Sequence, residues 1–180
     1  MQINAKLSKD KRIEIAAEEI FSKYGYEKAT LDQIVSLADV GKGTVYKYFG
    51  NKEQLFYKLV SAKNEPFVEA LRVAVESESE LKDKLTAYFK VMVEFYQKNC
   101  ALWQIIYYEM LNDTHCTVVF DAEDNAQVIS RYSEDTVSDE VKERFLRYHN
   151  LLTSEFEILY KIVVDGMKEG TLKSGNARIA

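Results

Sequence analysis

Apolar residues recur three or four positions apart along most of the chain, and this spacing predicts helices. Thr30 and Gln33 have the Thr-x-x-Gln spacing of a capping box, which predicts that a helix begins there. We expect Gly25 to end the helix before it, because glycine readily adopts the left-handed conformation that closes many helices. The three predicted N-terminal helices span residues 8–24, 30–38 and 42–49.

The helical pattern continues in longer stretches after residue 50. A fourth helix is expected to begin at Asn51 and to run towards Pro66, the only proline of the chain. Proline removes a backbone hydrogen bond from a helix interior, so Pro66 predicts either a kink in one helix or a break, with Asn64 capping a new helix. Further helices are expected over residues 81–96, after Asn99, and over 138–166.

The last predicted helix carries an apolar stripe that should face the core. Its members are Val141, Phe145, Tyr148, Leu152, Phe156, Leu159 and Val163. The segment 112–138 before it is more polar and less periodic, and a short helix around residues 122–132 is the element expected there. No stretch indicates a strand, so the pattern predicts an all-α fold.

Composition indicates an ordered, mostly helical protein. Apolar residues make up 47% of the 180 residues, with 7 Gly and 1 Pro, which argues against a disordered chain or a β-sandwich. No segment has the features of a signal peptide, and no apolar run approaches the ~18 residues of a membrane span. Two cysteines are too few for a disulfide framework and fit a reducing compartment. We therefore expect a cytoplasmic protein with no membrane partner.

The net charge of −5 hides an uneven distribution. Residues 1–64 hold 11 Lys and Arg against 8 Asp and Glu, whereas the remaining residues hold 13 against 21. Between residues 40 and 51, Lys42 and Lys47 are the only charged residues. A basic N-terminal part on an acidic body is typical of a protein whose N-terminal region contacts phosphate, although a merely solvated surface gives the same pattern.

Two short helices joined by a tight turn form a helix-turn-helix, whose second helix can enter the major groove of DNA. The run GYEKATLDQIVSLADVGKGTVYKYFGNKEQLF, which follows AAEEIFSKYG, resembles the TetR (tetracycline-repressor) family over about residues 10–60. Asp39 and Gly41 depart from the family pattern, where glycine and serine respectively are frequent. Neither departure removes the fold, because Asp tolerates the left-handed conformation and glycine at an N-cap costs only about a few tenths of a kcal/mol.

The resemblance implies a ligand-responsive repressor with two helical domains. Residues 1–50 would form a three-helix helix-turn-helix DNA-binding domain, and residues 51–180 a helical ligand-binding and dimerisation domain. A homodimer would place two recognition helices in successive major grooves of a pseudo-palindromic operator, and a small-molecule effector would release it. Family members usually carry two further helices that form the dimer bundle, so the dimer is implied only by the resemblance. The alternative is a helical protein-interaction module that has lost DNA binding.

Eight residues are predicted to contact the double-stranded DNA operator. They are Thr30, Lys42, Gly43, Thr44, Tyr46, Lys47, Tyr48 and Lys52. The lysines supply cations, the glycine lets the backbone approach closely, and the hydroxyl groups can donate to phosphates or base edges. Base readout is expected from Lys42, Thr44 and Lys47, while Val45 and Phe49 should face the core. Arg12, in the first predicted helix, either faces the DNA backbone or only solubilises the surface.

The aromatic-rich body contains candidate effector contacts between its helices. They are Met92, Phe95, Trp103, Tyr107, His149 and Phe156. For each of them the alternative is ordinary core packing, which is the commoner role of such side chains. Buried tyrosine hydroxyls need partners, so several on adjacent helices favour an aromatic or amphipathic effector. No cluster of arginine or lysine in this region demands an anionic ligand.

Catalysis finds no support in the sequence. His115 and His149 are 34 residues apart and match no metal-binding spacing, and no nucleophile elbow or phosphate-binding glycine loop is present. Cys116 follows His115 as a redox pair could, but neighbours in sequence rarely point at each other, which favours a structural or merely exposed thiol. We therefore predict no enzyme, no cofactor and no metal site.

Overall fold

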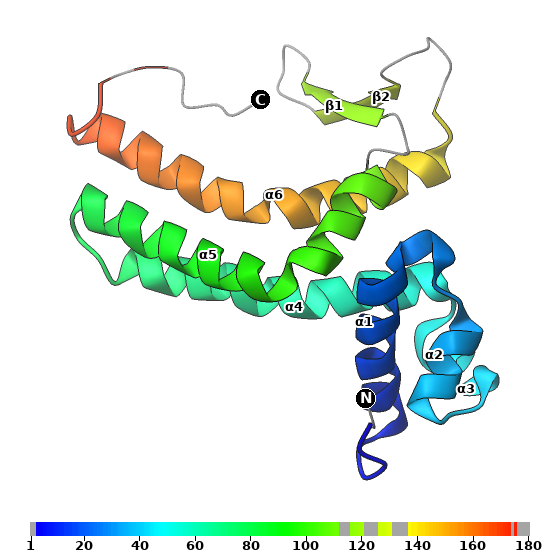
Figure 1. Cartoon of the computed structure of the whole chain (residues 1–180). Helices are drawn as coiled ribbons and strands as arrows, with labels where there is room; N and C mark the ends of the chain where they lie inside the picture. Colours follow the sequence, from blue (N-terminus) through cyan, green and yellow to red (C-terminus); the bar gives the residue numbers. More distant parts are fainter. Residues whose placement is uncertain (1–2, 112–115, 121–125, 131–136, 174, 176–180) are drawn as a thin grey trace. The chain divides into compact units, whose positions relative to one another are not determined.

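The computed structural model describes residues 3–111, 116–120, 126–130, 137–173 and 175. The chain forms two compact units: unit 1 contains residues 1–62 and 101–148, and unit 2 contains residues 63–100 and 149–180. Unit 1 holds three short helices, α1 (Lys9–Lys28), α2 (Leu31–Ala38) and α3 (Lys42–Phe49). The longer helices α4 (Lys52–Glu76), α5 (Leu81–Ile105) and α6 (Asp139–Lys168) each contribute residues to both units (Figure 1).

The three N-terminal helices share one apolar core, and Figure 1 shows α2 and α3 packed beside α1. Val45 and Phe49 of α3 are buried in it, as predicted. The other buried members are Ile13, Ala16, Ala17, Ile20 and Phe21 of α1, and Ile34 and Ala38 of α2. Phe56 of α4 joins them, with its ring edge-on to Phe21 at 5.0 Å between centroids. Edge-to-face contact is a favoured geometry for aromatic pairs. The predicted helix-turn-helix is therefore confirmed as a packed three-helix body.

Local hydrogen bonds fix both ends of α2. Thr30 Oγ1 accepts from the Gln33 backbone N–H at 3.2 Å, and Gln33 Oε1 accepts from the Thr30 N–H at 2.8 Å, which confirms the predicted capping box. Asp39 closes the helix in the left-handed conformation, at φ 51° and ψ 55°. This is the conformation that aspartate tolerates better than most residues, so its departure from the family pattern leaves the turn intact.

Replacing Thr30 by alanine should lower the free energy of unfolding by about 1 kcal/mol, because the N–H groups at the start of α2 lose their side-chain acceptor. Urea denaturation followed by circular dichroism measures this difference. Thr30→Ser is the matched control, since it keeps the hydroxyl and should stay close to the wild type. Equal stability of the alanine and serine variants would contradict the role of the cap.

Gly25 divides α1 into two helical stretches, and the first of them ends at this glycine, as predicted. Its φ of 76° and ψ of 176° lie outside the helical region, and helical residues then continue to Lys28, beyond the predicted end at residue 24. Glu109 lies in the π-helical segment η1 (Ile106–Leu111), and its Oε2 accepts from the Glu27 N–H at 2.8 Å. Its Oε1 would be 2.6 Å from a Cβ placed on Gly25. The carboxylate therefore packs where only glycine leaves room.

The helical fold that the sequence predicted is confirmed, with the addition of two short strands. β1 (Cys116–Phe120) and β2 (Ala126–Ser130) pair antiparallel, with Cys116 opposite Ser130 and Phe120 opposite Ala126. The prediction of no strands was wrong, and so was the short helix around 122–132 where it covers β2; residues 121–125 and 131–132 lie outside the described part. Adjacent β-branched residues favour extended backbone in both strands. Five residues are too few for an alternating pattern to stand out.

Cys116 is buried, which fits the structural thiol that the sequence favoured. His115, its neighbour in the proposed redox pair, lies outside the described residues.

Unit 2 has its own apolar core between α4, α5 and α6. The buried residues of this core are Phe67, Leu71, Val75, Tyr88 and Ile162. Phe67 of α4 stacks on Phe95 of α5, with 3.8 Å between ring centroids and 11° between ring planes. Within the described residues, no helix carries an apolar stretch long enough to cross a bilayer.

Pro66 lies inside α4, which runs from Lys52 to Glu76. The predicted break, with Asn64 as the cap of a new helix, was therefore wrong. Asn64 is buried and its Nδ2 donates to Ser154 Oγ at 3.1 Å, while Phe67 packs in the core. Burial of the residues on both sides of the exposed proline compensates for the backbone bond that proline removes.

The buried face of α6 differs from the predicted stripe. Ser138 caps the helix as expected, because its Oγ accepts from the Val141 N–H at 3.4 Å. Phe145 and Tyr148 are buried as predicted, but the buried positions then continue through Leu151, Glu155 and Ile162, whereas Phe156 is 41% exposed. The carboxylate at position 155 conceals the true register, because it breaks the apolar pattern on the buried face.

Candidate nucleic-acid interface

One face of α3 is turned towards solvent and carries most of the predicted DNA contacts. Lys42, Gly43, Tyr46, Lys47 and Tyr48 are exposed and Thr44 is half-buried. Val45 and Phe49 point the other way and are buried, as predicted. The exposed face thus combines two cations with hydroxyl donors on a helix of eight residues. These are the groups that contact phosphates, sugars and base edges.

Gly43 is not required by the protein interior. A Cβ placed on it would meet nothing within 4 Å. The residue is the second of α3, and the open space around it gives no reason for glycine within the protein itself. This space leaves room for the close approach of DNA that the prediction for Gly43 requires.

Lys42 is held by an exposed ion pair. Its Nζ lies 2.8 Å from Asp32 Oδ1, and both side chains are at least half exposed. The hydrogen bond that the Lys42 ammonium donates to Asp32 raises the pKa of Lys42, so the ammonium stays charged. Exposed pairs of this kind contribute little to stability, so a phosphate can replace the carboxylate as the partner.

The prediction that the Lys52 side chain contacts phosphate is corrected by its surroundings. Its Nζ donates to the carbonyl oxygens of Tyr26 at 2.8 Å, Ala29 at 3.1 Å and Glu27 at 3.4 Å. It also lies 4.2 Å from the centre of the Tyr26 ring. An ammonium has three hydrogens, and these three carbonyls use all of them. Lys52 therefore joins α4 to the α1–α2 connection.

Arg12 follows neither of the two alternatives predicted for it. The residue is only 9% exposed, and its Nη1 donates to Asp39 Oδ2 at 3.5 Å. It thus links α1 to the left-handed turn between α2 and α3. Thr30 remains exposed, but its hydroxyl is engaged in the capping box, and its contact with DNA stays a prediction.

A groove beside α3 adds a cation that the sequence analysis missed. The groove has a volume of about 520 Å³ and is lined by Tyr46, Lys47, Tyr48, Phe49, Gly50, Gln54, Tyr57, Lys58 and Ser61. Lys58 Nζ lies 5.0 Å from the centre of the Phe49 ring, which places it next to the end of α3. The sequence could have indicated it, since Lys58 follows Lys52 by six residues in the same predicted helix. Lys47 and Lys58 together make this groove suitable for phosphate.

Comparison with known proteins identifies the family. Residues 15–59, from α1 into α4, match the family described as "Bacterial regulatory proteins, tetR family". Over 168 residues the chain is 27% identical to the "Uncharacterized HTH-type transcriptional regulator YhgD" of Bacillus subtilis (strain 168), covering 93% of this chain and 73% of that protein. The chain belongs to the TetR family. It is a helix-turn-helix transcriptional regulator, and no enzyme family is indicated.

Further TetR-like proteins share the fold over most of the chain. The "Fatty acid metabolism regulator protein" of Bacillus subtilis (strain 168) is 26% identical over 160 residues, which cover 89% of this chain and 69% of that protein. A tetR-family regulatory protein from Rhodococcus RHA1 superposes with a TM-score of 0.69 at 20% identity, over 96% of this chain and 76% of that one. FadR from Bacillus subtilis, solved in complex with stearoyl-CoA, gives a TM-score of 0.63 at 21% identity, over 92% and 74%.

The six candidate effector contacts are divided between the two units, with Trp103 and Tyr107 in unit 1 and the other four in unit 2. Met92 and Phe95 pack against the core of unit 2, and Trp103 is buried in unit 1. Tyr107 is 59% exposed and Phe156 41% exposed, so neither lines an enclosed space. His149 is half-buried, and burial lowers the pKa of its imidazole. Of the six, Met92 and Phe95 pack between helices of unit 2, as the prediction required.

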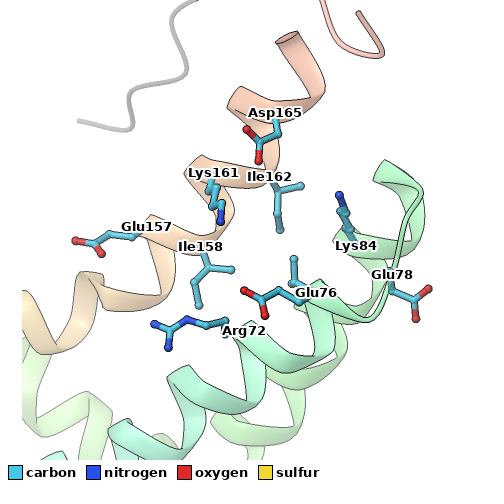
Figure 2. Close-up of a pocket in the computed structure, with 10 residues that line it drawn as sticks. Arg72, Glu76, Glu78, Lys84, Glu157, Ile158, Lys161, Ile162 and Asp165 are labelled. Atoms are coloured by element: carbon cyan, nitrogen blue, oxygen red, sulfur yellow. The ribbon is translucent and has the colours of Figure 1, made fainter. Parts of the chain in front are cut away.

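A pocket of about 420 Å³ opens at the surface of unit 2 (Figure 2). Arg72 and Glu76 from α4 face Lys161 and Ile162 from α6 across it, and Val75 also lines it. The remaining lining residues are Glu78, Lys84, Glu157, Ile158 and Asp165. Cations and acids alternate around its mouth, so the pocket does not favour one sign of ligand charge, and none of the six candidates lines it. In the described part of the chain, no His, Cys, Asp and Glu cluster could hold a metal ion.

Glu155 is the most unusual polar residue of unit 2. It is fully buried, and its Oε1 accepts from the Tyr96 hydroxyl at 2.8 Å. The Tyr88 hydroxyl donates to the Glu155 backbone carbonyl at 3.2 Å. Burial raises the pKa of the Glu155 carboxyl and, next to it, raises the pKa of Tyr88 to about 12.

Glu155→Gln should remove a pH dependence of stability. Because the folded protein holds the Glu155 proton more tightly than the unfolded chain, the wild type should lose stability as pH rises from the ordinary value of 4.5 through the raised pKa. One group changes the unfolding free energy by at most about 1.4 kcal/mol per pH unit. Urea denaturation of both proteins across this range measures the difference, which should grow with pH. A constant difference would contradict the raised pKa.

Proposed function

We propose that this TetR-family regulator is a ligand-responsive repressor that binds a pseudo-palindromic operator as a homodimer and is released by an amphipathic small molecule. The observation that carries the DNA-binding part is the exposed face of α3, where Gly43 has no internal role and Lys47 shares a groove with Lys58. A helix of this kind fits the major groove, and the flanking cations fit the phosphates on either side.

The homodimer is proposed on geometric grounds. A single helix of eight residues reads only a few base pairs, whereas two copies related by a two-fold axis read two half-sites about one DNA turn apart. The amphipathic class of effector is supported by two relatives, one named a fatty acid metabolism regulator and one crystallised with stearoyl-CoA. Release then requires only that the effector binds one of two conformations more tightly.

Mobility shift on DNA fragments from the region upstream of its own gene tests this function. The protein should shift a specific fragment, and the affinity should fall steeply between about 50 and 200 mM salt, because each phosphate contact releases counterions. Footprinting should then show two protected half-sites. A chain that shifts none of these fragments at low salt would favour the protein-interaction module instead.

A further inference from the structure

The groove beside α3 differs in charge from the rest of the chain. Of the nine residues that line it, two are lysines, Lys47 and Lys58, and none is acidic. The chain as a whole carries 29 Asp and Glu against 24 Lys and Arg, and the pocket of unit 2 is lined by four acids. The polar groups that accompany the two lysines are the hydroxyls of Tyr46, Tyr48, Tyr57 and Ser61 and the amide of Gln54. All of them can donate hydrogen bonds, so the groove favours an anion.

Both lysines of the groove are available to a ligand. Among the described residues, none forms an ion pair with Lys47 or Lys58. Both side chains are exposed. The Lys58 ammonium lies 5.0 Å from the centre of the Phe49 ring, and this contact keeps it beside the end of α3. A ring face takes up none of the three hydrogens in the way that the carbonyls around Lys52 do, so they stay free for an outside acceptor.

Asp10, in the first turn of α1, is an acid that acts on Lys58 at longer range. The pKa of the Asp10 carboxyl is lowered mainly by a hydrogen bond with Ser8, and the charge of Lys58 adds a smaller effect. In the described part of the chain no ion pair joins the two side chains. Attraction between separated, exposed charges is weak and is screened by salt. Asp10 therefore does not take the place of a ligand at the Lys58 ammonium.

The groove lies at the opposite end of α3 from Lys42 and Gly43. It is lined by the last four residues of the helix and by Gly50, whereas Lys42 is its first residue. A helix rises about 1.5 Å per residue, so the two ends of α3 are about 10 Å apart. One phosphate cannot contact both ends. A phosphate in the groove is therefore a different one from any that meets the first turn of α3.

We propose that this groove binds one backbone phosphate of the operator, and that Lys58, instead of Lys52, is the cation that α4 supplies to DNA. The inference rests on the proposed function and adds to it a second region of contact, outside the exposed face of α3. Lys47 and Lys58 hold the phosphate from two helices, and the Tyr48 hydroxyl is a neutral donor beside them. Because a backbone phosphate carries no sequence information, the groove fixes the position of α3 on the DNA and reads no base.

Lys58→Ala tests the residue on the DNA fragment that the mobility shift selects. It should lower the affinity about 3- to 30-fold and reduce the slope of log affinity against log salt by about one, as for one lost phosphate contact. Lys58→Arg keeps the charge and should stay within about 3-fold of the wild type. Lys23→Ala is the matched control, since it removes an exposed lysine of the same unit that does not line the groove. It should bind like the wild type.

Single methylphosphonate substitutions identify the phosphate itself. Each one removes the charge of one phosphate of the fragment while leaving the bases unchanged. At the phosphate that the groove binds, the substitution should weaken the wild type but have little further effect on Lys58→Ala, because the same contact is already lost. At every other phosphate the two proteins should lose affinity by the same factor.

Inorganic phosphate separates the DNA backbone from a free anion as the occupant. Replacing chloride by phosphate at constant ionic strength should change the DNA affinity of the wild type by less than about 2-fold, because a free ion lacks the neighbouring contacts that hold a backbone phosphate in place. Displacement of DNA from the wild type but not from Lys58→Ala would make the groove a site for small anions and overturn the proposal.

Three further results would overturn it: equal affinity and salt slope in wild type and Lys58→Ala, an equal loss in Lys23→Ala, or no phosphate at which the two losses overlap. Thermal unfolding shows that each variant is folded before the titrations. A wild type that shifts no fragment rejects the proposed function, and this inference with it. A wild type that shifts a fragment as tightly as Lys58→Ala does rejects this inference alone.

Discussion

Gly25→Ala should destabilise the protein by about 2–4 kcal/mol, because two separate costs act at this position. The φ of 76° with ψ of 176° is a backbone conformation that residues with a Cβ rarely adopt. The new methyl group would also lie 2.6 Å from Glu109 Oε1, so the carboxylate must move and give up its bond to the Glu27 N–H. Urea denaturation measures the loss.

Gly43→Ala is the matched control for this prediction. It is the second residue of α3 and has open space around it, so alanine should stabilise the protein by about 0.4–1 kcal/mol. The same variant should bind operator DNA more weakly if the backbone approaches the DNA closely there.

The double variant Gly25→Ala/Glu109→Ala tests the crowding at Gly25. It should recover the part of the stability loss that comes from the contact between the new methyl group and the Glu109 carboxylate. A change of stability in the same direction in both single glycine variants would contradict the contrast between a crowded Gly25 and an open Gly43.

Lys47→Ala should lower operator affinity about 5- to 50-fold and reduce the slope of log affinity against log salt by about one, as expected for one lost phosphate or base contact. The side chain is exposed and lines the groove with Lys58, and no described residue forms an ion pair with it. Its removal should therefore leave the free energy of unfolding within about 0.5 kcal/mol of the wild type.

Lys82→Ala provides the control, since it removes an exposed lysine from unit 2. Its affinity and salt dependence should match those of the wild type if a local contact at residue 47, rather than net charge, governs binding. Equal losses in both variants would mean that the net charge, rather than a contact at residue 47, governs affinity.

The DNA-binding part was predictable because its signals are local. Thr30 and Gln33 cap α2 through bonds between residues three apart, and Val45 and Phe49 face the core because four residues make about one helical turn. Such patterns depend little on the rest of the chain. The family resemblance then supplied the function that pattern alone left open.

Apart from the short hairpin, the failures involve residues whose partners lie far away in the sequence. The Lys52 ammonium donates to carbonyls at the end of α1 and just after it, instead of facing phosphate. Asn64 donates to Ser154 instead of capping a new helix. On α6, the burial of Glu155 moved the core face away from Phe156. A buried carboxylate contradicts the ordinary preference of that residue type, and no local rule anticipates it.

The ammonium of Lys52 is enclosed by three carbonyls and the Tyr26 ring. DNA binding through exposed lysines and this internal contact should therefore respond differently to ionic strength. Salt screens exposed charges strongly but partly enclosed ones much less. Raising the salt should therefore remove the protein from DNA well before it loosens the contact between α4 and the end of α1. Concentrated salt would then yield a regulator that is folded but free of nucleic acid, which is the form needed for effector titrations and for crystallisation.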